Sequence, residues 1–140
     1  MDSVKILSLS TGKILNKKVQ KYKKQEIFTV NSFPYALNVS AGATIFFEPN
    51  CPEFDLRFDI FDAEGKELDE EVHEFDPDFE RIVTTESGII VFEIWMTPKQ
   101  HIAKSPGMYT IKATILHGDG EVLDELSTRF YLIKSVDESV

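Results

Sequence analysis

Residues 106–133 read as two strands joined by a tight turn, and this feature most constrains the fold. Residues 108–115 (M-Y-T-I-K-A-T-I) alternate large apolar with polar or small side chains, which places one set on one face of a sheet. The following Gly118-Asp119-Gly120 favours a type I′ hairpin turn, whose two central residues have positive φ. The segment therefore predicts a β-hairpin within an all-β chain.

The rest of the chain predicts more short strands separated by turns. Apolar or β-branched residues gather in runs over 4–9, 26–30, 43–48, 54–62, 79–84 and 89–96. We expect turns at Thr11-Gly12-Lys13, Ala41-Gly42 and residues 63–66, and a loop at Asp76-Pro77-Asp78. Because no segment sustains an apolar period of 3.6, we predict an antiparallel immunoglobulin-like β-sandwich of seven to nine strands.

The run over 54–62 has the clearest alternation of apolar and charged residues. Three apolar side chains are expected to face the core: Leu56, Phe58 and Ile60. Three charged side chains are expected to face solvent: Asp55, Arg57 and Asp59. A slip of one residue in register would exchange the two sets.

Four pieces of sequence occur in a recognisable order. They are residues 32–37 (S-F-P-Y-A-L), 58–68 (F-D-I-F-D-A-E-G-K-E-L), 106–111 (P-G-M-Y-T-I) and 120–125 (G-E-V-L-D-E). This order resembles a family of small uncharacterised bacterial proteins expected to form immunoglobulin-like sandwiches. The likeness extends from Val4 to Ile133. It implies the same fold and brings no known activity.

The length and composition indicate where such a chain works. We expect one domain over residues 1–134 and a frayed tail over 135–140. The single Cys51 excludes an intrachain disulfide and fits a reducing compartment. The N-terminal residues lack a signal-peptide pattern, and no run approaches the roughly 20 apolar residues of a membrane span. These features predict a soluble, cytoplasmic protein.

The net charge of −9 is unevenly distributed. Residues 1–24 carry seven Lys and one Asp, which is +6, whereas residues 25–140 carry 8 basic and 23 acidic residues, which is −15. The acidic body disfavours a nucleic-acid partner. Three roles stay open for the basic stretch: protection of an edge strand, association with an acidic protein or second copy, or contact with nucleic acid or acidic lipid.

Between Asp55 and Glu80 the chain carries twelve carboxylates. Calcium takes six to eight oxygen ligands, so a calcium- or lipid-responsive C2-like domain is the alternative function, with Asp59, Asp62, Asp76 and Asp78 as ligands if the strand ends meet. The other interpretation is a solvated hairpin face. Because no D-x-D-x-D-G loop occurs, we expect calcium to bind weakly or not at all.

Motifs for catalysis are absent from the sequence. His73, His101 and His117 are isolated, and nothing local activates Cys51, which reads as a small apolar filler. Neither a serine elbow nor a phosphate-binding loop occurs, and a carboxylate pair would arise by chance among 24 acidic residues. We therefore predict no enzyme and no cofactor.

Two adjacent aromatic pairs, Phe46-Phe47 and Phe130-Tyr131, must send one ring to each face of a sheet. Their outer rings then need a covering element or form a binding surface, and Trp and Met are enriched at interface cores. The predicted protein-contact residues are Trp95, Met96, Phe47, Tyr131, Lys17, Lys18 and Lys21. We predict a non-enzymatic protein-binding or assembly module and expect an isologous homodimer.

Overall fold

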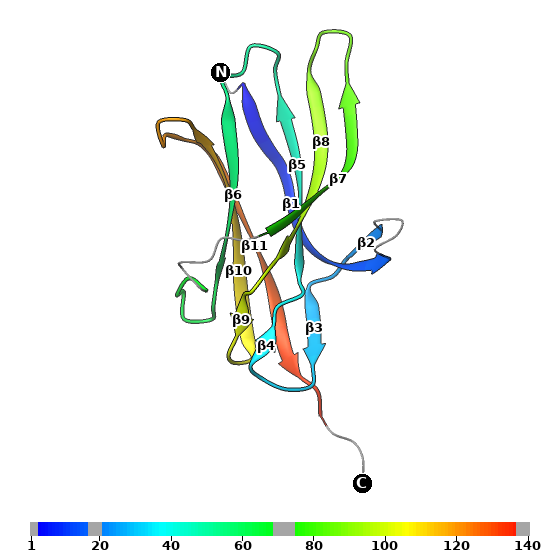
Figure 1. Cartoon of the computed structure of the whole chain (residues 1–140), viewed down its shortest axis with the longest axis vertical. Coiled ribbons are helices and arrows are strands. Elements are labelled where there is room, and N and C mark those ends of the chain that lie inside the picture. Colours follow the sequence, from blue (N-terminus) through cyan, green and yellow to red (C-terminus); the bar gives the residue numbers. More distant parts are fainter. Residues whose placement is uncertain (1–2, 17–20, 69–74, 137–140) are drawn as a thin grey trace.

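The computed structural model describes residues 3–16, 21–68 and 75–136 (Figure 1). These residues form strands and no helix, which confirms the predicted all-β class. The strands are β1 (Val4–Asn16), β2 (Lys21–Lys24), β3 (Ile27–Val30), β4 (Tyr35–Ala36), β5 (Ser40–Phe47), β6 (Phe54–Phe61), β7 (Phe75–Thr84), β8 (Ile90–Pro98), β9 (Ile102–Ala103), β10 (Gly107–His117) and β11 (Val122–Lys134). Long strands follow from the many aromatic and β-branched residues.

Two sheets contain most of these strands. A five-stranded antiparallel sheet has the order β2-β1-β5-β8-β7, and a four-stranded sheet has the order β3-β11-β10-β6. The four-stranded sheet is mixed, because β3 runs parallel to β11, whereas the sequence predicted antiparallel pairing throughout. The two-residue strands β4 and β9 form a small third sheet. The two larger sheets together contain nine strands, the upper limit of the predicted seven to nine, and β4 and β9 bring the total in the described residues to eleven.

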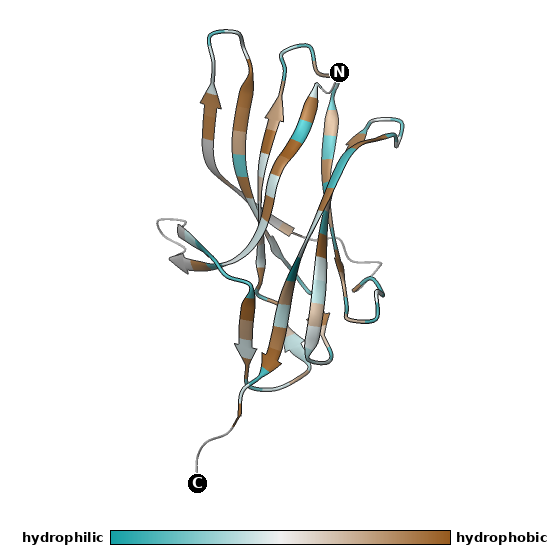
Figure 2. Cartoon of the chain, turned by 180° about the vertical axis from the view of Figure 1, so that it is seen from behind, coloured by the Kyte–Doolittle hydropathy of each residue, from teal (hydrophilic) through white to brown (hydrophobic). Residues whose placement is uncertain are grey.

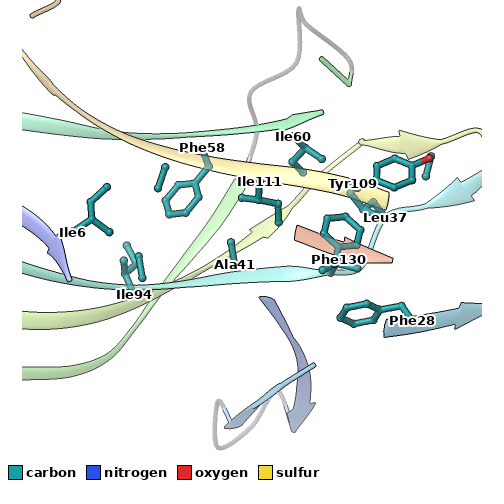
Figure 3. Packing of buried hydrophobic residues seen from close by; sticks show 14 of the residues in the cluster. Ile6, Phe28, Leu37, Ala41, Phe58, Ile60, Ile94, Tyr109, Ile111 and Phe130 are labelled. Atoms are coloured by element: carbon teal, nitrogen blue, oxygen red, sulfur yellow. The ribbon is translucent and has the colours of Figure 1, made fainter. Parts of the chain in front are cut away.

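The hydrophobic core lies between the two larger sheets (Figure 3). From the four-stranded sheet it receives the alternate side chains of β10 that the hairpin pattern predicted, Tyr109, Ile111, Ala113 and Ile115. Ala41, Ala43 and Ile45 of β5 come from the other sheet. Burial of these apolar side chains supplies the main driving force for folding.

Strand β6 confirms part of its predicted pattern. Phe58 and Ile60 are buried in the core, and Leu56 packs against it. The prediction was wrong for Asp59, which is only 6% exposed, and Arg57 Nε, 3.1 Å from its Oδ1, compensates the buried charge. The register is therefore as predicted, and the buried carboxylate is an addition that the alternation alone did not indicate.

Three turns share one local structure. In each, the fourth residue is a glycine with positive φ whose N–H donates to the carbonyl of the first residue: Asp62 to Gly65, Thr85 to Gly88 and His117 to Gly120. In the last turn only Gly120 has positive φ, so it is not the type I′ turn that the sequence favoured. A three-residue loop with glycine in the left-handed position is the next most common hairpin connection.

Two expected turns and one expected loop are strand segments instead. Gly12 lies inside β1, Ala41 and Gly42 lie inside β5, and Asp76-Pro77-Asp78 belongs to β7. Pro77 fits because β7 is an edge strand, where a missing N–H leaves the sheet intact. Of the predicted tail, Ser135 N donates to Val30 O at 2.8 Å, and residues 137–140 lie outside the described residues.

Candidate protein-binding edge

A row of aromatic rings crosses the core side of the five-stranded sheet and ends at its edge. Phe54 lies 5.5 Å from Phe47, Phe47 lies 5.9 Å from Phe92, and Phe92 lies 5.7 Å from Phe79, measured between ring centroids. The first three rings are partly buried against the core, whereas Phe79 on β7 is 56% exposed. The row therefore carries apolar surface from the interior out to solvent.

Strand β7 forms the outer edge of this sheet. Within the described residues its backbone pairs with β8 alone, so its other side offers unpaired N–H and C=O groups. Ile82, which faces Phe92 across the pair, is 64% exposed, and the adjacent Val83 is exposed on the opposite face. We call Phe79, Ile82 and Val83 the β7 edge.

The position of β7 at the edge of the wider sheet explains why its apolar side chains are exposed. In Figures 1 and 2 the end of β7 lies on the side of the molecule away from β6, the edge strand of the other sheet. The four-stranded sheet is one strand narrower, and β8 is the one strand that β7 contacts extensively in the described residues. Figure 2 also shows hydrophobic stretches on both strands of the β7–β8 hairpin. The β7 edge is thus apolar surface that no other described strand covers.

The inner end of the aromatic row lines a cavity of about 390 Å³. Its lining includes the apolar Phe47, Phe54 and Cys51 and the acidic Glu48, Glu53 and Asp55. Cys51 packs against the core, as expected for a small apolar filler. Phe47, a predicted contact residue, therefore belongs both to the lining of this cavity and to the aromatic row that leads to the β7 edge.

Trp95, another predicted contact residue, is only 6% exposed. It stacks on Tyr22 with ring centroids 4.7 Å apart and planes 4° apart. A Cβ added at Gly12 or Gly42 would lie 2.7 Å from the indole, so these two glycines permit its close approach. The ring of Tyr22 on β2 therefore packs against Trp95, whereas Met96, the next residue, packs against the core.

Tyr131 lies on the outer face of the four-stranded sheet, whereas Trp95, Met96 and Phe47 belong to the five-stranded sheet. The pair Phe130-Tyr131 divides as predicted, because Phe130 is 1% exposed and Tyr131 is 46% exposed. Tyr131 pairs with Ile27 of β3 on one side and Met108 of β10 on the other, which gives a short apolar strip. The structure therefore does not join Tyr131 to Trp95, Met96 or Phe47 in one patch.

The predicted basic contacts fall largely outside the described residues. Lys17 and Lys18 lie outside them, and the side chain of Lys21 does too, although its backbone belongs to β2. Lys23 and Lys24 of the same strand are exposed. The contact role of the Lys cluster stays a prediction.

Of the polar groups proposed for other chemistry, Asp59, Asp62 and His101 have structural partners, and the side chains of Asp76 and Asp78 lie outside the described residues. Asp62 Oδ1 accepts the N–H groups of Glu64 and Lys66, and Asp59 pairs with Arg57. His101 is buried with Nδ1 2.7 Å from Lys99 O, and His73 lies outside the described residues. In the part of the chain that the structure describes, no three His, Cys, Asp or Glu side chains are placed to hold a metal ion.

A second cavity, of about 380 Å³, lies near the loop that follows β6, and its lining includes the titratable groups of Asp62, Lys66 and Glu67. Tyr109 contributes to its lining, and its hydroxyl donates to Ser105 O at 2.6 Å. Burial raises the pKa of Tyr109 above its ordinary value, so its hydroxyl stays protonated at neutral pH. The Tyr109 hydroxyl therefore acts as a protonated hydrogen-bond donor to Ser105 and not as a general base.

The sequence did not single out the β7 edge, although one signal was available. Ile82 and Val83 are adjacent apolar residues in a strand, so they point to opposite faces, as the aromatic pairs do. Periodicity shows that such a strand has two apolar faces. It does not show that the strand occupies the edge of the wider sheet.

Comparisons with known proteins add little. No protein-family model matches the sequence, and no curated protein matches it significantly. Among solved structures, the chain has a TM-score of 0.39 and 11% identity to a family 123 glycoside hydrolase from Clostridium perfringens studied for glycolipid glycan hydrolysis. The match covers 96% of this chain and 27% of the hydrolase chain. At this level of similarity it assigns neither a family nor an activity, and the described residues hold no helix that could cross a membrane.

Proposed function

We propose that this chain is a non-enzymatic, cytoplasmic protein-binding or assembly module with an immunoglobulin-like sandwich fold, and that its β7 edge receives a strand of a protein partner. The observation that carries the proposal is the exposed, apolar edge strand beside the aromatic row, which among the described residues pairs with β8 alone. Two sheets around one core, with mostly antiparallel pairing, support the immunoglobulin-like assignment.

Strand addition explains why such an edge is useful. A partner strand would satisfy the free backbone groups of β7, while its side chains would cover Phe79 and Ile82 on one face and Val83 on the other. Long exposed apolar edges are otherwise sites of uncontrolled aggregation. The net charge of −9 supports a protein partner over nucleic acid, because phosphate contacts need a basic surface.

The test compares three forms of the full chain as affinity baits in lysate from the source cells: wild type, Ile82→Lys and Val122→Lys. Val122 is a matched control because it is 53% exposed, close to the 64% of Ile82, and lies at the start of β11. We expect a defined protein, which includes untagged copies of this chain, to be retained by wild type and Val122→Lys and lost with Ile82→Lys. Equal retention by all three baits would contradict the proposal.

A further inference from the structure

We infer that the cavity of about 390 Å³ beside Phe47 binds the side chain of a lysine from a protein partner. Its lining combines aromatic rings with carboxylates, and a lysine side chain combines an apolar stem with a charged end. This site goes beyond the proposed function, because the cavity does not include the β7 edge. The two proposals can therefore fail separately.

The apolar part of the cavity is formed where the two larger sheets meet. Phe47 ends β5 of one sheet and Phe54 begins β6 of the other, and their rings meet edge to face with centroids 5.5 Å apart. Both rings are only partly buried and both line the cavity. The face of a phenylalanine ring attracts an ammonium group that lies within about 6 Å of its centroid.

The acidic part of the lining consists of Glu48, Glu53 and Asp55. Among the described residues, none of these three side chains pairs with a cationic group. A cation between them would offset the repulsion among like charges and form charge-assisted hydrogen bonds. The ammonium of lysine has three N–H donors, so it can serve more than one carboxylate at once.

The end of the molecule around the cavity has the same sign of charge. The connections 48–53, 85–89 and 118–121 lie at this end (Figure 1), and a Cβ added at Gly88 would lie 2.8 Å from Pro49 Cγ. In sequence, the three connections contain no Lys or Arg, and their carboxylates are those of Glu48, Glu53, Glu86, Asp119 and Glu121. A hollow surrounded by one sign of charge attracts ligands of the opposite sign. Charge complementarity therefore selects a cation.

The aromatic lining decides which cation fits. A free diamine carries a charge at both ends of its stem, so one charge would lie against the rings or outside the cavity. A lysine side chain has one charge and keeps an apolar stem for Phe47 and Phe54. The combination of rings and carboxylates therefore favours a lysine side chain over a diamine.

Amide chemical shifts of the full chain, titrated at constant ionic strength, test this inference. The probe is Nα-acetyl-lysine N-methylamide, and the matched control is the norleucine compound, which has the same stem without the ammonium. We expect the lysine probe to move the amides of Cys51 and Gly118, both in the lining, to saturation with a dissociation constant in roughly the millimolar range. The norleucine compound should bind at least about fivefold more weakly.

Paired variants separate the cavity from the general charge of this end. Glu53→Gln combined with Asp55→Asn removes two exposed charges from the lining and keeps the side-chain shapes, so the fold should be retained. We expect it to weaken the lysine probe at least about fivefold. The control Glu86→Gln removes an exposed charge outside the lining and should change binding less than about twofold. The emission of Trp95, the single tryptophan, checks the fold of each variant.

Four outcomes would overturn the inference. They are the absence of saturable shifts at the cavity, equal binding of the norleucine compound, an equal loss from Glu86→Gln, and binding of butane-1,4-diamine at least about tenfold tighter than the lysine probe. The last result would assign the cavity to a free amine. The proposed function would survive all four, because its own test depends on Ile82.

Discussion

The ring of Tyr22 lies flat on the indole of Trp95, 4.7 Å away, although β1 and β5 separate their strands. In a flat sheet β2 and β8 would be about 14 Å apart, three strand spacings. The five-stranded sheet must therefore curl until its first and fourth strands approach. This contact explains why β1 and β5 carry glycine where the indole crosses them.

Gly42→Ala should loosen this contact. The new Cβ would lie 2.7 Å from three indole atoms, so Trp95 must shift, and we expect a loss of about 1–3 kcal/mol of stability with a change in Trp95 emission. Gly118→Ala is the control, because no atom lies within 4 Å of its added Cβ. Urea unfolding followed by fluorescence measures both, and equal curves for Gly42→Ala and wild type would refute the role of the glycine.

Asp124→Ala should weaken a bond between the two larger sheets. Ile6 N donates to Asp124 Oδ2 at 2.8 Å, at the point where the β1–β5 register shifts and the strand ladder is irregular. Because the buried N–H of Ile6 would lose its acceptor, we expect a cost of about 1–3 kcal/mol by thermal unfolding. The exposed neighbour Glu125→Ala should cost far less, and similar losses from the two variants would argue against this bond.

Phe58→Ala should be among the most destabilising single changes. Its ring is 2% exposed and lies 5.9 Å from that of Phe75, so truncation leaves a cavity that we expect to cost about 3–5 kcal/mol. Tyr131→Ala removes a ring of similar size that is half exposed and should cost less than about 1 kcal/mol. Chemical unfolding ranks the two, and the reverse order would mean that β6 is out of register.

Stability should fall in alkaline solution, in part through Tyr109. Burial raises its pKa above the ordinary 10.0, so above about pH 10 the unfolded chain loses this proton first. The contribution is complete below that pH and is lost as the pH rises towards the folded-state pKa. Tyr109→Phe should make the fall between about pH 9 and 11 shallower without removing it, because burial raises the pKa of Tyr35 as well. An unchanged or steeper fall in urea unfolding would contradict this.

Much of the fold follows from local sequence, because alternation and glycine turns are local signals. The β10–β11 hairpin, the core face of β6 and the division of Phe130 from Tyr131 were all predictable on this basis. Gly12 and Gly42 were wrongly predicted to lie in turns, because the need for glycine at these positions comes from tertiary packing. They make room for Trp95, which is far away in sequence. No local pattern distinguishes such a glycine from one in a turn.

The candidate site was less accessible to prediction than the fold. Phe47 was identified, but its connection through Phe92 to Phe79 depends on which strands are neighbours in the sheet. Pro77 made β7 read as a loop at one end, since proline rarely occurs in a central strand. The sequence does not show the order of the strands in the sheet. That order decides which strand lies at the edge and which of its side chains are exposed.

A photoactivatable cross-linking amino acid at position 82 tests the central claim, addition of a partner strand at the β7 edge, most directly. Ile82 is 64% exposed, so this replacement should leave the fold intact. Irradiation in lysate from the source cells should join the chain covalently to a defined protein, whereas the same group at Val122, which is 53% exposed, should not. Equal adducts from the two positions, or none from position 82, would contradict the account.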